Sequence, residues 1–192
     1  MAQAAFHAEL LDLPETLVGG RVLLRPYRPG DGAALFAAID GHRAELGKWL
    51  GWLDQHQTPD DSEAYVRRLH AKWQERSALI LAIWSRDGKD YLGGTGFHGL
   101  DWTVPSFELG YFLHPDAHGH GYASEAVRLV VDFGFKSLAA RRIWASCDAQ
   151  NVRSVRVLER CGFAREGTLK NERRNLQGGL RDTLLFALTT PP

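Results

Sequence analysis

Residues 107–138 read FELGYFLHPDAHGHGYASEAVRLVVDFGFKSL, which joins two kinds of periodicity through a glycine-rich turn. Residues 107–113 form a short apolar run typical of a strand, and strand alternation sends Glu108 and Tyr111 to opposite faces. Over residues 122–138, apolar side chains recur at helical spacing. The stretch therefore predicts a strand, a tight turn and a helix.

The turn itself, residues 118–121, suits an anionic ligand. Glycines let successive backbone N–H groups approach a ligand closely, and the N-terminus of the following helix adds a partial positive charge. A phosphate group fits such a place. Two glycines at a strand-to-helix turn also occur for tight packing alone, so the turn by itself does not identify a ligand.

Two common phosphate-binding patterns are absent from the chain. The Walker pattern GxxxxGK[ST] does not occur, which disfavours a nucleoside triphosphatase. The dinucleotide pattern GxGxxG fails at Ser124, where a third glycine would stand, and no acid lies near residue 140. A dinucleotide-binding domain is therefore disfavoured as well.

The rest of the chain alternates strand and helix patterns. Arg86-Asp87-Gly88-Lys89 separates two apolar runs and predicts a β-hairpin. The other expected strands are 22–27, 79–84, 91–99, 143–147, 163–169 and 183–188, and the other expected helices are 33–40, 61–74 and 151–160. This order predicts a mixed α/β sheet. We expect a lead-in over residues 1–16 and a single domain over residues 17–192.

Composition argues against several classes of protein. The 192 residues carry 23 Lys plus Arg and 23 Asp plus Glu, and this balance disfavours bulk nucleic acid or an anionic membrane as the main partner. No apolar stretch approaches the roughly 18 residues of a membrane span, and the N-terminus lacks the basic region of a secretory signal. Cys147 and Cys161 form no paired framework, so we expect reduced thiols in a cytoplasmic protein.

Six sequence blocks occur in the order found in one enzyme family. They are LLRPYRPGDG (23–32), LGKWLGW (46–52), FELGYFLHP (107–115), PDAHGHGYASEAVRLVVDFGF (115–135), NVRSVRVLERCGFAREGTLK (151–170) and LRDTLLFAL (180–188). Together they resemble the GCN5-related N-acetyltransferases (GNAT), in the branch of the ribosomal-protein serine/alanine N-acetyltransferases (Rim type). The resemblance covers roughly residues 17–190. It implies the GNAT fold, a twisted, mostly antiparallel α/β sheet of about seven strands, splayed at the cofactor cleft and flanked by helices.

The resemblance also implies acetyl-CoA as the acetyl donor and coenzyme A as a product. The backbone of Phe112 and Leu113 would pair with the pantetheine like a missing strand, and the amides of residues 119–123 would hold the pyrophosphate. The residues implied in cofactor binding are Phe112, Leu113, His118, Gly119, His120, Gly121, Tyr122, Ala123, Asn151 and Ser154. His118 departs from the family pattern, which usually has Gln or Arg at this position.

Asn151 and Ser154 lie one helical turn apart and therefore on one face of the helix. The resemblance implies that Asn151 contacts the pantetheine and that Ser154 lies near the thioester, where it could donate to the departing thiolate. The alternative is a helix cap at Asn151 and a small residue facing a strand at Ser154. Leu158 stands where several branches have a Tyr, so Ser154 or a water is the expected general acid.

Glu108 is the candidate general base. A carboxylate inside an otherwise apolar strand is costly unless it has a partner or a chemical task. Acids recur here in the resembling proteins, where they are often proposed to act through water. The alternative is an ion pair with an Arg or a hydrogen bond to a neighbouring loop. We expect Glu108 and Ser154 to be catalytic, with His98 as a second candidate base.

The acceptor is expected to be a primary amine. An α-amine has a pKa of about 7.7–8.0 against about 10.4 for lysine, so more of it is neutral, which favours a protein or peptide N-terminus. Small-molecule amines (polyamines, amino acids, antibiotics) are the alternative, followed by a non-catalytic acyl-CoA-binding regulatory module. We expect no direct nucleic-acid binding and no membrane association, and a homodimer is allowed for.

Trp49, Trp52 and His98 are candidate substrate-binding residues, because the tryptophans of the LGKWLGW block wall the acceptor site in related proteins. Packing of both rings in the core is the alternative. The histidines of the HPDAHGH segment, at 114, 118 and 120, suggest a metal, but ligation needs three or four converging ligands. Because the turn is already assigned to phosphate, we expect no metal there.

Overall fold

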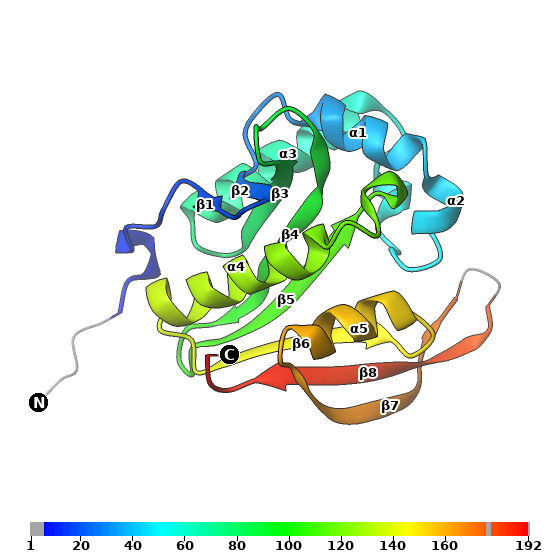
Figure 1. Ribbon diagram of the computed structural model, residues 1–192. Coiled ribbons are helices and arrows are strands. Elements are labelled where there is room, and N and C mark those ends of the chain that lie inside the picture. Colours follow the sequence, from blue (N-terminus) through cyan, green and yellow to red (C-terminus); the bar gives the residue numbers. More distant parts are fainter. Residues whose placement is uncertain (1–5, 176–177, 192) are drawn as a thin grey trace, which may run out of the picture.

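The computed structural model describes residues 6–175 and 178–191, which form one mixed sheet with helices on both faces (Figure 1). The strands are β1 (Leu17–Val18), β2 (Val22–Pro26), β3 (Leu79–Ser85), β4 (Tyr91–Asp101), β5 (Ser106–Leu113), β6 (Arg142–Asp148), β7 (Ala164–Arg174) and β8 (Leu180–Leu188). The helices are α1 (Gly32–Asp40), α2 (Arg43–Leu46), α3 (Pro59–Gln74), α4 (Tyr122–Ser137) and α5 (Val152–Arg160), with short 3-10 helices η1 (Ala8–Leu10), η2 (Leu53–Gln55) and η3 (Pro115–Ala117). Within the described part of the chain, none of them has the length and apolar character needed to span a bilayer.

The sheet has the order β1-β2-β3-β4-β5-β6-β8-β7, and its neighbours are antiparallel except for β5 and β6. The parallel pair is short, running from Ser106 opposite Arg142 to Glu108 opposite Trp144. Beyond Glu108, β5 pairs with β4 and β6 pairs with β8, so the sheet opens between them (Figure 1). The predicted splayed sheet is confirmed, with the two-residue β1 as an extra strand.

Strand alternation explains why helices cover both faces. On β3, Leu79 and Leu81 belong to the core that includes the buried side of α4, whereas Ala82 belongs to the core beneath α1 and α3. On β5, Leu109 lies in the α4 core and Phe112 packs against the α1/α3 core. The predicted alternation of β5 is therefore confirmed, and it places Glu108 and Tyr111 on different faces.

Helix α3 begins two residues earlier than the sequence pattern indicates. Thr58 is the N-cap residue, and its Oγ1 accepts a hydrogen bond from the Asp61 backbone N–H (3.1 Å). The Asp61 carboxylate accepts in turn from the Thr58 backbone N–H (2.9 Å). Pro59 occupies the first helical position, where a missing N–H costs no intrahelical bond. This reciprocal capping box fixes the start of the helix.

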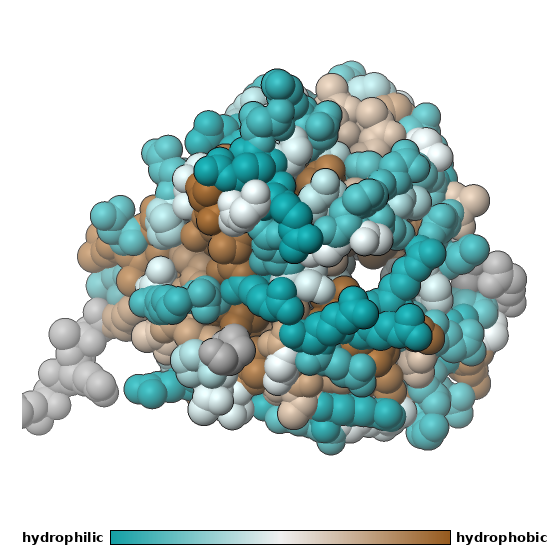
Figure 2. Space-filling model, viewed as in Figure 1, coloured by the Kyte–Doolittle hydropathy of each residue, from teal (hydrophilic) through white to brown (hydrophobic). Residues whose placement is uncertain are grey.

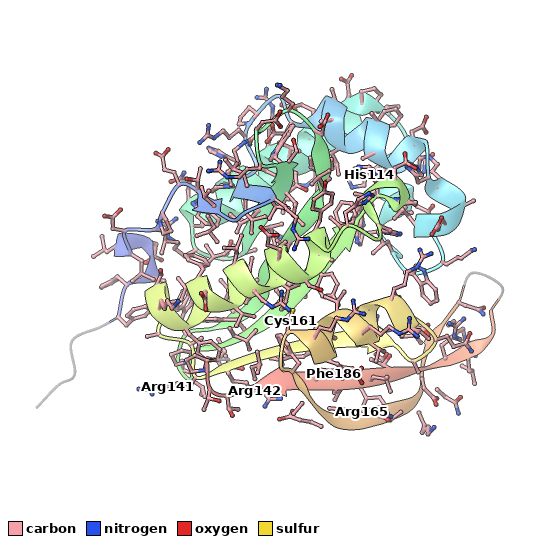
Figure 3. The ribbon with its side chains drawn as sticks, viewed as in Figure 1. His114, Arg141, Arg142, Cys161, Arg165 and Phe186 are labelled. Carbon is pink, nitrogen blue, oxygen red and sulfur yellow. The ribbon has the colours of Figure 1, made fainter. Side chains whose placement is uncertain are left out.

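Both cysteines are free and buried, as expected. Cys161 lies between α4 and α5 (Figure 3), and its thiol donates to the Ser124 carbonyl (3.5 Å). Burial raises the pKa of both thiols, so Cys147 and Cys161 stay protonated and serve as small core side chains.

Candidate active site

A cleft of about 540 Å³ opens where β5 leaves β6. Its walls come from the end of β5, the turn before α4, the first part of α4, helix α5 and the segment around α2. Figure 2 shows a hollow on this face, bordered by largely hydrophilic residues. Most of the predicted cofactor-binding residues line it: Phe112, Leu113, His118, Gly119, Gly121, Tyr122, Ala123, Asn151 and Ser154.

Two glycines give the turn its shape. Gly119 and Gly121 have φ angles of +83° and +79°, in the left-handed region that favours glycine. Gly121 is the N-cap residue of α4, and it carries no side chain that could accept from the first N–H groups of the helix. The cap residue therefore leaves these N–H groups without a side-chain partner, which is the arrangement that an anionic ligand would need.

Arg21 holds this turn from outside the cleft. Its Nη1 donates to the His120 carbonyl (3.0 Å), and its Nε pairs with Oε2 of Glu125 in the first turn of α4 (2.7 Å). The His120 ring stacks on Tyr122, with 5.5 Å between ring centroids, and it lies outside the lining of the cleft. Sequence reasoning missed Arg21, because its partners lie about a hundred residues further along the chain.

His118 links β5 to α5 along the wall of the cleft. Its Nε2 donates to the Leu113 carbonyl (3.2 Å), and its Nδ1 accepts from Nη1 of Arg153 (2.9 Å). Arg153 also pairs with Glu45 of α2 (2.9 Å). An imidazole that donates through one nitrogen and accepts through the other is neutral. The departure from the family pattern at His118 therefore has a structural role, which occupies part of the Leu113 backbone predicted to meet the pantetheine.

Ser154 is held by a tyrosine that sequence reasoning missed. The Tyr111 hydroxyl lies 2.8 Å from Ser154 Oγ and donates to the Ser154 carbonyl (3.0 Å). Burial raises the pKa of Tyr111, so its phenol keeps its proton. Asn151 caps α5 by accepting from the Ser154 backbone N–H (3.1 Å), which is the alternative role considered for it. Strand alternation predicted that Tyr111 and Glu108 lie on opposite faces of the sheet. The contact of Tyr111 with Ser154 follows only from the position of α5.

Glu108 lies at the last paired position of β5 and β6, on the other face from Tyr111. Its Oε1 accepts from Ser146 Oγ (3.3 Å), and its Oε2 lies 3.2 Å from Nδ1 of His98. Arg173 Nη2 donates to Ser146 Oγ (3.1 Å), so Arg173 is linked to Glu108 by hydrogen bonds through the serine hydroxyl. The Glu108 side chain is 22% exposed. The two candidate bases therefore form one partly solvent-accessible pair.

Polar groups thus flank the opening between β5 and β6 from both faces. Glu108 and His98 lie on one face and stay outside the lining of the cleft. Ser154 and Tyr111 lie on the other face and line it. Two molecules that approach from opposite faces would meet at the opening.

The two tryptophans have different environments. Trp49 lines the cleft and is 37% exposed, with the Arg181 guanidinium carbon 5.7 Å from its ring centroid. Trp52 packs between Tyr65 and Phe112, with centroid distances of 6.1 Å and 5.3 Å. Trp49 therefore reaches the cleft directly, whereas Trp52 is partly buried and lies behind Phe112, which lines the cleft. The assignment of both rings to the acceptor site stays a prediction.

Comparison with known proteins places the chain in a family. The family model described as Acetyltransferase (GNAT) domain matches residues 21–164. The chain belongs to the GNAT acetyltransferase family. This acetyltransferase is 30% identical to the uncharacterized N-acetyltransferase YoaA of Bacillus subtilis over 171 residues, which cover 89% of this chain and 94% of YoaA.

Two further relatives have more specific names. The ribosomal protein uS5-alanine N-acetyltransferase of Escherichia coli is 27% identical over 179 residues, covering 91% of each chain. The solved structure of Mycobacterium smegmatis RimJ in complex with CoA-disulfide has a TM-score of 0.82 at 26% identity, covering 96% of this chain and 90% of RimJ. The relationship therefore extends over nearly the whole chain.

The protein is an acetyl-CoA-dependent N-acetyltransferase, and its cleft fits that donor. The N–H groups of the turn and of the start of α4 suit a pyrophosphate. Helix α5 adds the guanidinium groups of Arg153, Arg156 and Arg160 to the lining, which suits a polyanionic nucleotide. Beyond Glu108, no strand of the described residues covers this edge of β5, which therefore offers backbone groups to an extended chain. Family membership also disfavours a non-catalytic regulatory module.

Gly119→Ala is expected to weaken coenzyme A binding by about tenfold, measured by isothermal titration calorimetry. An L side chain in the left-handed region costs about 1–2 kcal/mol. The variant would have to adopt this backbone conformation to bind coenzyme A, and that cost corresponds to about a tenfold rise in Kd. Gly88→Ala is the matched control, since Gly88 has φ +74° in the β3–β4 hairpin and, like Gly119, has open space around its Cβ position. Equal affinities for coenzyme A in the two variants would contradict the assignment of the turn.

Proposed function

We propose that this acetyltransferase modifies the N-terminal α-amine of a protein or peptide by direct attack in a ternary complex. The observation that carries the proposal is the pair of polar groups on opposite faces of the opening between β5 and β6. Holding both reactants at attack distance supplies much of the acceleration in such a transfer. The named specificity of the E. coli relative for an alanine of a ribosomal protein supports a protein acceptor.

Each polar group has a task in this proposal. When bound, acetyl-CoA supplies the thioester carbonyl that the amine attacks, so a C–N bond forms and the C–S bond breaks. Glu108 takes the amine proton, directly or through a water, with His98 beside it. The Ser154 hydroxyl gives a proton to the departing sulfur and takes one back from solvent, and Tyr111 positions that hydroxyl.

An α-amine is the acceptor that depends least on deprotonation by the general base. Its pKa of about 7.7–8.0 leaves a substantial neutral fraction at neutral pH, whereas lysine at about 10.4 is almost fully charged. The His98 side chain is 47% exposed, so the face that carries Glu108 is open to an incoming chain terminus. A protein acceptor of this kind also implies a cytoplasmic enzyme.

The test is an acetyl-CoA assay against a panel of amines, read by mass spectrometry. The panel contains peptides beginning with Ser or Ala, the same peptides with blocked N-termini and an internal lysine, polyamines, amino acids and aminoglycosides. We expect one added acetyl group on the free N-terminal peptides and none on the blocked ones. Acetylation confined to a small-molecule class would contradict the proposal and identify the acceptor in its place.

Tyr111→Phe is expected to lower kcat by a factor of about ten and to leave the KM for acetyl-CoA nearly unchanged. The substitution removes the hydroxyl that contacts Ser154 Oγ but keeps the buried ring. Loss of one hydrogen bond lowers the free energy of unfolding by about 1 kcal/mol. Thermal unfolding of the variant measures this effect, so that it can be separated from the effect on kcat. A wild-type kcat in this variant would show that Tyr111 does not position Ser154.

A further inference from the structure

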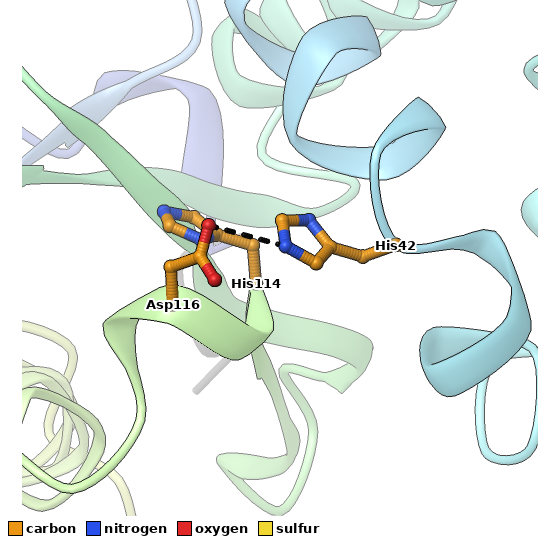
Figure 4. A group of neighbouring side chains, drawn as sticks. All are labelled: His42, His114 and Asp116. Atoms are coloured by element: carbon orange, nitrogen blue, oxygen red, sulfur yellow. Dashed lines mark ion pairs between the residues drawn. The ribbon is translucent and has the colours of Figure 1, made fainter.

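Three side chains from distant segments converge outside the cleft (Figure 4). His42 lies between α1 and α2, His114 lies between β5 and η3, and Asp116 lies in η3. Each offers one ligand atom, and these atoms lie within 4.8 Å of one another. Nε2 of His42 is 3.2 Å from Oδ2 of Asp116, and the two imidazoles stack with 5.6 Å between centroids.

Backbone carbonyls determine which nitrogen of each ring is free. Nδ1 of His42 donates to the Ala38 carbonyl (3.1 Å), and Nε2 of His114 donates to the Tyr91 carbonyl (3.1 Å). In a neutral imidazole the other nitrogen then carries a lone pair, which is Nε2 in His42 and Nδ1 in His114. A carbonyl that accepts from the non-ligating nitrogen is the usual second contact of a metal-binding histidine.

One of these lone pairs has no protein partner. Nδ1 of His114 is buried and makes no hydrogen bond to any of the described residues. Burial lowers the pKa of His114, which keeps its ring neutral. A proton on Nε2 of His42 would satisfy the contact with Asp116 but would leave His114 Nδ1 without a protein partner among the described residues. A cation shared by all three groups satisfies each of them.

We propose that His42, His114 and Asp116 bind one divalent transition-metal ion. Two imidazoles and a carboxylate, with water as the fourth ligand, match zinc best, whereas Mg²⁺ prefers oxygen ligands alone. In a tetrahedral zinc site with bonds of about 2.0–2.1 Å, ligand atoms are about 3.4 Å apart. Nε2 of His42 and Oδ2 of Asp116 already lie at about that spacing (3.2 Å), and the remaining ligand-atom distances, at most 4.8 Å, would have to shorten on binding.

The proposed metal would have a structural role. None of its three ligands is among the residues that line the cleft. The ion would tie the end of α1 to η3, the segment that leads directly into the turn at Gly119. The histidines of the HPDAHGH segment did not predict this cluster. His118 contacts Leu113 and Arg153 instead, while His114 stacks on His42, which lies far earlier in the chain (Figures 3 and 4).

The test is calorimetric titration of Zn²⁺ into the full-length, untagged chain after treatment with a chelator. We expect one zinc per chain, no comparable binding of Mg²⁺, and a rise in Tm of about 5 °C or more once free zinc exceeds Kd by about 100-fold. Asp116→Asn changes an exposed carboxylate and preserves folding, and it should weaken zinc binding by about tenfold or more. His42→Gln should do the same, while His7→Ala, at an exposed histidine outside the cluster, should bind as wild type.

Each result decides the proposal. Zinc binding that weakens in Asp116→Asn and His42→Gln but not in His7→Ala supports the site. Stoichiometric binding that is indifferent to the first two substitutions would locate zinc elsewhere and overturn it. Absence of zinc binding by the folded wild-type chain would overturn it as well, and would leave His42 and Asp116 as an ion pair.

Discussion

Glu108→Gln is expected to lower kcat by about 10²-fold or more, the usual contribution of a general base. Glutamine has the same shape and can still accept from Ser146 Oγ, so the opening between β5 and β6 keeps its geometry. It has no basic oxygen for the amine proton. Steady-state kinetics with the best peptide acceptor should therefore show a loss in kcat with little change in the Kd for acetyl-CoA.

Glu75→Gln is the matched control, because it changes an exposed carboxylate at the end of α3, away from the opening. We expect wild-type kinetics for that variant. His98→Gln distinguishes the members of the pair, because a larger loss in kcat there than in Glu108→Gln would make His98 the base. An unchanged kcat in Glu108→Gln would remove Glu108 from the mechanism.

Ser154→Ala is expected to be the second most damaging substitution, with a loss in kcat of roughly 10²-fold from the missing proton donor. The helix should tolerate it, because alanine has the highest helix propensity and the backbone N–H still donates to Asn151. Single-turnover measurements at saturating acetyl-CoA would report the chemical step alone.

Ser137→Ala provides the control for the serine substitution, since Ser137 is exposed at the last residue of α4. Both variants should unfold at nearly the wild-type Tm. If Ser154→Ala kept the wild-type single-turnover rate, a water would have to protonate the sulfur. The contact between Tyr111 and Ser154 would then be purely structural.

The elements that position the site follow from local sequence patterns. Alternation over residues 107–113 and helical spacing over residues 122–138 gave β5 and α4 nearly as observed, because both periodicities act between near neighbours. The two glycines of the turn likewise indicated a left-handed backbone. The resemblance to a family supplied the splay between β5 and β6, which no local pattern reports.

What the sequence did not reveal are contacts between distant segments. Tyr111 meets Ser154, and His42 meets His114, only because the sheet order and the helix packing bring those residues together. Trp52 illustrates the same limit, because its contact with Phe112 joins two segments that lie far apart in the sequence. Long-range packing decided each of these cases.

The central claim is that acceptor and donor meet from opposite faces of the opening between β5 and β6. The most direct measurement is a crystal structure with coenzyme A joined through an acetyl linker to the N-terminus of an alanyl peptide. We predict that the coenzyme lies in the cleft against Gly119 and Ser154, while the peptide leaves past Glu108 and His98. A peptide that leaves on the same face as the coenzyme, away from Glu108, would contradict the account.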